Sequence, residues 1–169
     1  GSITEYMGFG KVKNPKLPVV AIPTTAGTGS EATQVTIIND VERDVKMLIS
    51  DPHITPEVAL DDPVLTLSMP KLTTAATGID TLTHAIEAYI SVKAQPITDI
   101  LAIKAIKLVS ANLRQAWVDG SNIEARNSML LASLLGGMAF SNSSVALVHG
   151  MSRPIGACFH VPQIGRAHV

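Results

Sequence analysis

Short apolar runs separated by turns fill the first third of the chain. Aliphatic and β-branched residues cluster at 17–22, 35–38, 45–49 and 58–60, and each run is followed by a proline or a polar turn residue. Runs of this length between turn residues predict β-strands. From about residue 70 the apolar positions recur every three or four residues in long segments rich in alanine and leucine, which predicts helices. The chain is therefore expected to begin with strands and to continue as a helical body.

The predicted helices lie at 70–92, 97–117 and 123–140, with a fourth from about residue 145. Ser68 is the expected N-cap of the first helix, and Pro70 falls in its first turn, where a missing N–H costs no hydrogen bond. Gly120 follows the end of the second helix, as glycine commonly does. The change of pattern between Pro63 and Pro70 predicts a domain boundary there.

Composition narrows the class of protein. The 169 residues are 46% hydrophobic and 16% charged, which is typical of a soluble globular domain. The net charge of -1 gives no electrostatic footprint for nucleic acid or an anionic membrane, and it favours a small neutral or weakly charged ligand. The single cysteine, Cys158, excludes an internal disulfide, agrees with a reducing cytoplasm and is expected to be buried as a small apolar residue.

The sequence predicts neither a membrane-spanning segment nor a secretory signal peptide. The apolar run at 129–140 is interrupted by Ser133 and is too short to span a membrane. The first residues have no signal-peptide pattern and no initiator methionine. We therefore expect a soluble protein whose natural N-terminus lies upstream.

A glycine-rich segment, PTTAGTGSE, follows the first predicted strand at residues 23–31. Gly27 and Gly29 allow the backbone to approach a ligand closely, and the neighbouring N–H and hydroxyl groups can donate to phosphate oxygens. The segment matches neither G-x-G-x-x-G nor the P-loop, because no lysine follows the second glycine. On local sequence alone, a glycine turn capped by hydroxyl groups is an equally good interpretation.

Three polar residues in apolar surroundings are candidate metal ligands. Asp80 and His84 stand four residues apart in the first predicted helix, so both project from one face and can bind the same cation. A hydrogen bond between them is the simpler interpretation of this spacing alone. His149, beside Gly150, is a candidate third ligand, although a histidine in the core is the commoner outcome. Sets of imidazole and carboxylate suit Zn(II) or Fe(II).

Taken together, these segments resemble the iron-containing alcohol dehydrogenase family, especially its lactaldehyde reductase and propanediol dehydrogenase branch. The resemblance covers nearly the whole chain and rests on PTTAGTGSE at 23–31, LDDP at 60–63, ATGIDTLTHAIEAY at 76–89 and HGMSRPIGACFHVP at 149–162. It implies that 1–66 is the last part of an α/β dinucleotide-binding domain and that 67–162 is the first part of an all-α metal-binding domain. Both domains are expected to be incomplete, with the active site in the cleft between them.

The resemblance also implies roles for single residues. Asp80, His84 and His149 correspond to the family's first three metal ligands, for Fe(II) or alternatively Zn(II). Arg153 stands where several relatives have a second histidine proposed to relay protons. The positions that correspond to contacts with NAD or NADP are Thr24, Thr25, Thr28, Ser30, Lys46, Leu65 and Met69.

The family's fourth ligand is the histidine of a V-P-H-G motif, where this chain has Val161, Pro162 and Gln163. An amide oxygen is a poor substitute for imidazole on Fe(II). Residues 163–169 can be translated from one base C followed by AGATCGGAAGAGCACACGTC, the start of a widely used sequencing adapter. We therefore expect 163–169 to be a non-native tail, in which His168 has no role, and the natural codon 163 to encode histidine.

The implied activity of the complete protein is hydride transfer between NAD(P) and a small alcohol or diol, giving the aldehyde or ketone. We expect a cytoplasmic homo-oligomer with no nucleic-acid or membrane partner, and we expect this chain by itself to be inactive. His53 is expected in a surface turn, and Glu87 as a structural hydrogen-bond partner rather than an acid–base catalyst.

Two other interpretations stay open. One is a metal enzyme of the dehydroquinate synthase or glycerol dehydrogenase type, although a phosphorylated substrate would favour more basic residues than the sequence has. The other is a non-catalytic helical module, in which the three candidate ligands are polar core residues that bind no metal.

Overall fold

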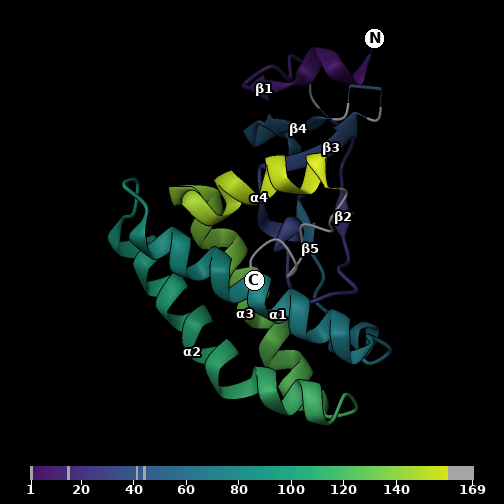
Figure 1. Ribbon diagram of the computed structural model, residues 1–169, viewed down its shortest axis with the longest axis vertical. Helices are drawn as coiled ribbons and strands as arrows, with labels where there is room; N and C mark the ends of the chain where they lie inside the picture. The colour runs from purple at the N-terminus through teal and green to yellow at the C-terminus, as the bar shows by residue number, and fades with distance from the viewer. Residues whose placement is uncertain (1, 15, 41, 44, 160–169) are drawn as a thin grey trace.

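The computed structural model describes residues 2–14, 16–40, 42–43 and 45–159. The strands gather towards the N-terminus, three long helices pack side by side away from them, and the fourth helix, α4 (Leu147–Cys158), crosses between the two groups (Figure 1). The predicted fold class, strands followed by a helical body, is therefore confirmed.

Two small sheets form the strand-containing part. β3 (Val35–Asp40) and β4 (Val45–Ser50) pair antiparallel, and β1 (Gly8–Phe9) adds to β4 in parallel. β2 (Val20–Ala21) and β5 (Val58–Ala59) form a separate parallel pair. The strand predicted at 17–22 is therefore too long, because its pairing with β5 covers only two residues. Side chains alternate along β4: Met47 and Ile49 are buried, whereas Lys46 and Leu48 line a cavity on the other face.

The long helices follow the predicted spacing closely. α1 (Lys71–Ile90), α2 (Pro96–Val118) and α3 (Ile123–Ser143) each differ from the predicted limits by at most three residues. The N-cap of α1 is Pro70, so the predicted capping role of Ser68 is wrong. Asn122 caps α3 by accepting a hydrogen bond from the backbone N–H of Ala125. The described residues also form short 3₁₀ turns at Ile3–Tyr6, Ser30–Ala32, Pro52–Ile54 and Pro63–Thr66.

Alanine gives the helical body its close packing. Small side chains let helix backbones approach one another, and α1, α2 and α3 are in mutual contact. Buried Arg126 ties the start of α3 to α1, since its guanidinium donates to Thr74 Oγ1 at 2.7 Å and to the Gly120 carbonyl at 2.9 Å. The fully buried alanines are Ala85, Ala88, Ala102, Ala105, Ala132 and Ala139. The result is a rigid platform for α4 and for the glycine-rich loop.

The structure also describes the surroundings of Cys158 and the length of the apolar helices. Cys158 is exposed at the end of α4, so its predicted burial is wrong: the last turn of this helix is not covered by the part of the chain that the structure describes. No single described helix is long and apolar enough to cross a membrane, and α3 and α4 reach such a composition only as a pair bent by 99°.

Candidate metal centre

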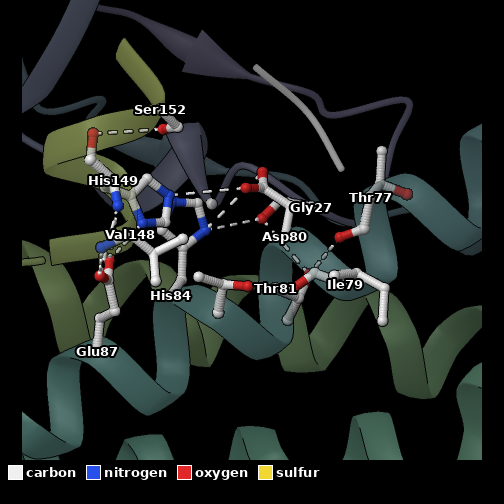
Figure 2. Close-up of polar contacts among 12 residues, drawn as sticks. Gly27, Thr77, Ile79, Asp80, Thr81, His84, Glu87, Val148, His149 and Ser152 are labelled. Atoms are coloured by element: carbon white, nitrogen blue, oxygen red, sulfur yellow. Dashed lines mark hydrogen bonds and ion pairs between the residues drawn. The ribbon is translucent and has the colours of Figure 1, made fainter. Parts of the chain in front are cut away.

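Two helices bring Asp80, His84 and His149 together. Asp80 and His84 lie one turn apart on α1, and His149 comes from the first turn of α4. Each offers one ligand atom, and these atoms all lie within 4.8 Å of one another. All three residues are buried, with 3%, 8% and 2% of their surface exposed. Figure 2 shows the three side chains turned toward one another, which is the arrangement that the sequence spacing alone left open.

The rings of the two histidines are held by stacking. His84 and His149 stack with centroids 4.3 Å apart, and Phe140 of α3 covers the other face of His84 at 4.4 Å. Nε2 of His149 is 3.6 Å from Asp80 Oδ1, and Nδ1 of His84 is 4.0 Å from Asp80 Oδ2. Nothing in the local sequence singles out Phe140, since an aromatic residue at the end of an apolar run is usually part of the core. Its stacking contact restricts the orientation of His84.

Glu87 orients His149 from the side opposite Asp80 (Figure 2). One carboxylate oxygen lies 2.5 Å from Nδ1 of His149, and the other accepts a hydrogen bond of 2.6 Å from the backbone N–H of Val148. Burial alone would raise the pKa of Glu87, but the hydrogen bonds from His149 and from backbone amides outweigh it and lower the pKa. An ionised Glu87 only accepts, so Nδ1 of His149 donates to it, and Nε2 is the ring nitrogen that faces Asp80. The prediction of a structural hydrogen-bond partner is confirmed.

This donor set fits a divalent transition metal. One carboxylate and two imidazoles, buried and convergent, form a set of ligands typical of Fe(II) and Zn(II). Three such ligands from the described residues would leave coordination positions for a further ligand or substrate. The fourth position predicted from the family, Gln163, and the whole tail at 163–169 lie outside the described residues.

The glycine-rich loop packs directly against the metal-site helices. A Cβ on Gly27 would lie 2.7 Å from Cβ of Thr77 on α1, and a Cβ on Gly29 would lie 2.6 Å from Cα of Gly137 on α3. Gly29 also has φ of 60°, in the left-handed region that favours glycine. Both glycines were expected to admit a ligand. The structure shows a further reason for glycine at both positions, which is the close approach of the loop to two helices.

Hydrogen bonds fix the loop in this position. Thr81 Oγ1 lies within 3.4 Å of the Ala26 and Gly27 carbonyls, and Ser133 Oγ accepts from the Gly29 N–H at 3.2 Å. Nδ1 of His84 lies 3.3 Å from the Gly27 carbonyl. The same carbonyl therefore links the loop to a candidate metal ligand.

A cavity of about 1150 Å³ opens between the candidate ligands, the glycine-rich loop and β3–β4. Of the predicted cofactor residues, Thr28, Ser30 and Lys46 line it together with the three candidate ligands. The others do not: Thr24, Thr25, Leu65 and Met69 lie outside its lining. His53 is well exposed in its 3₁₀ turn, as predicted, and bonds to Asp51 at 2.7 Å.

Comparison with known proteins agrees with this geometry. Residues 74–168 match the family model described as "Fe-containing alcohol dehydrogenase family, C-terminal", and residues 1–63 match "Iron-containing alcohol dehydrogenase". The chain belongs to the iron-containing alcohol dehydrogenase family. The resemblance stated from the sequence is therefore confirmed.

Relatives with established names share almost the whole chain. It is 46% identical to 1,3-propanediol dehydrogenase of Klebsiella pneumoniae over 162 residues, which cover 96% of this chain and 42% of that protein. It is 47% identical to the NAD-dependent methanol dehydrogenase of Bacillus methanolicus over 159 residues, 94% of this chain and 42% of that protein. The chain thus spans less than half the length of these relatives.

Solved structures of similar proteins share the fold of this chain. A crystal structure of 1,3-propanediol oxidoreductase superimposes with a TM-score of 0.95 at 45% identity, over 99% of this chain and 44% of that one. Sulfoacetaldehyde reductase from Bifidobacterium kashiwanohense, solved with NAD+, superimposes with a TM-score of 0.91 at 41% identity, over 99% of this chain and 45% of that one. The described fold is therefore the fold of this enzyme family.

Proposed function

We propose that the complete protein is a metal-dependent, NAD(P)-linked alcohol dehydrogenase that interconverts a small alcohol or diol and its aldehyde or ketone. The observation that carries this proposal is the buried convergence of Asp80, His84 and His149 from two helices. The names of the relatives support it, since they include a propanediol dehydrogenase and an NAD-dependent methanol dehydrogenase.

The three convergent side chains are the proposed metal ligands. When bound, Fe(II) or alternatively Zn(II) supplies a Lewis acid at the substrate oxygen, and the nicotinamide supplies or accepts the hydride. Asp80 lowers the net charge of the site, and Glu87 holds His149 in the tautomer whose Nε2 can ligate. Burial of the three ligands excludes water from the side of the site that the helices cover.

The cofactor is proposed to bind along the glycine-rich loop and β4. Thr28, Ser30 and Lys46 support this through their place in the cavity wall beside the candidate ligands. NAD is favoured by the solved relative that holds NAD+ and by the methanol dehydrogenase named as NAD-dependent. We also propose the roles inferred for Thr24, Thr25, Leu65 and Met69, the division at 66–67, a cytoplasmic location and a homo-oligomer.

Removal and return of the metal tests the proposed function. Because the chain spans 42% of its relatives, the assay uses the complete protein from the intact reading frame. Treatment with a chelator should abolish NADH-dependent reduction of propanal, and Fe(II) or Zn(II) should restore it. Turnover that survives complete removal of metal would overturn the proposal. So would a metal-loaded protein that, with NADH, reduces none of the small aldehydes and ketones offered to it.

A further inference from the structure

Arg153 lies in the wall of the cavity beside the candidate metal ligands. It follows His149 by four residues on α4, so the two side chains project from the same face of the helix about one turn apart. A turn of helix rises about 5.4 Å. A group bound by Arg153 would therefore lie only a few bonds from an oxygen bound near His149.

The guanidinium of Arg153 has charge compensation from Glu87, but one of its N–H donors has no acceptor among the described residues. Its Nε is buried and has no hydrogen-bond partner in the described part of the chain. Burial lowers the pKa of Arg153 and the charge of Glu87 raises it, yet an arginine stays protonated in proteins. The oxygens of Glu87 already accept from Nδ1 of His149 and from the N–H of Val148. A buried donor without an acceptor is costly, so an anion supplied by a ligand would stabilise it.

The charges around the cavity favour the same kind of ligand. Its lining includes three cationic side chains, Lys46, Lys93 and Arg153, and a single carboxylate, Asp80. Asp80 is itself turned toward His84 and His149. The rest of the wall therefore attracts negative charge, and a guanidinium forms two parallel hydrogen bonds with a carboxylate or sulfonate.

We propose that Arg153 binds a carboxylate or sulfonate on the substrate itself, and that the enzyme therefore prefers aldehydes carrying such an anionic group a few bonds from the carbonyl. This inference rests on the proposed function and adds its substrate class. The pyrophosphate of the cofactor is the rival anion. Arg153 is assigned to the substrate because it shares a helix face with His149, next to the place where the substrate oxygen would bind.

The test compares succinic semialdehyde with butanal, which has the same chain length and no charge, in the complete protein at saturating NADH. Arg153→Met should lower kcat/KM for succinic semialdehyde by about 10- to 100-fold more than it lowers kcat/KM for butanal, which is the usual worth of a hydrogen-bonded charge. Arg153→Lys should recover part of the loss. Equal losses on both aldehydes, or a higher KM for NADH alone, would overturn the inference.

A binding measurement separates this inference from the proposed function. Calorimetric titration of the metal-free protein with succinate should show binding that is about 10-fold or more weaker in Arg153→Met. If the wild type reduces neither aldehyde, the proposed function fails, and succinate binding still decides the role of Arg153. If the wild type reduces both and neither assay distinguishes the variant, only the inference about Arg153 fails.

Discussion

The contact between the glycine-rich loop and α3 leads to a quantitative prediction. Gly136 and Gly137 are neighbours on α3, and alanine at either position improves helix propensity by about 1 kcal/mol. A Cβ on Gly137 would lie 2.7 Å from the carbonyl oxygen and 2.9 Å from Cα of Gly29, both backbone atoms that cannot rotate away. A Cβ on Gly136 would meet its nearest atom, the Thr81 carbonyl oxygen, at 3.7 Å, which is ordinary contact.

The two substitutions therefore differ only in the steric term. Overpacking against backbone costs about 1–3 kcal/mol, so Gly137→Ala should be less stable than Gly136→Ala by about that amount. Urea unfolding of the complete protein, followed by far-UV circular dichroism, measures the difference. Gly137→Ala should also weaken NADH binding, because the displaced loop carries Thr28 and Ser30. Equal stability and equal NADH affinity of the two variants would refute the assigned role of the contact.

Three further predictions follow from the described contacts. Glu87→Gln should lower metal affinity by about 10- to 100-fold in competition with a chelator, and unchanged affinity would argue against its role in orienting His149. Burial and the nearby charge of Asp61 raise the pKa of Glu31 above 4.5, so folded Glu31 holds its proton more tightly than unfolded Glu31, and its contribution to stability should fall as pH rises from about 4.5 through the raised pKa. Compared with the wild type, Glu31→Gln should lose less stability between about pH 4.5 and neutral pH and be the more stable protein at neutral pH in urea unfolding, whereas identical pH dependences would contradict the assignment. The isolated 169-residue chain should reduce no aldehyde and should bind a hydrophobic dye, since large apolar side chains such as Phe9 and Leu17 are 75% and 84% exposed; measurable turnover would contradict this.

The sequence predicted the helices well because their apolar spacing is a local property. The same periodicity placed Asp80 and His84 on one face, and Glu87, seven residues after Asp80, continues that face. The short strands were harder to predict, since β1 and β2 exist only where a distant segment pairs with them.

Long-range contacts account for what local sequence did not reveal. The approach of His149 to Asp80 depends on how α4 packs against α1, and without the family resemblance nothing in the sequence joined them. The packing partners of Gly27 and Gly29 lie on α1 and α3, so the glycine-rich segment alone could not reveal this packing role. Stacking of Phe140 on His84 likewise arises only once α3 lies beside α1.

The metal content of the complete protein tests the central claim most directly. The set to compare by elemental analysis is the wild type, Asp80→Asn, His84→Ala, His149→Ala and, as a matched control, His53→Ala, which removes an exposed histidine that does not line the cavity. The account predicts stoichiometric iron or zinc in the wild type and in His53→Ala, and its loss from the other three variants while their circular dichroism spectra stay native. Stoichiometric metal retained in a folded His84→Ala or His149→Ala protein would contradict it.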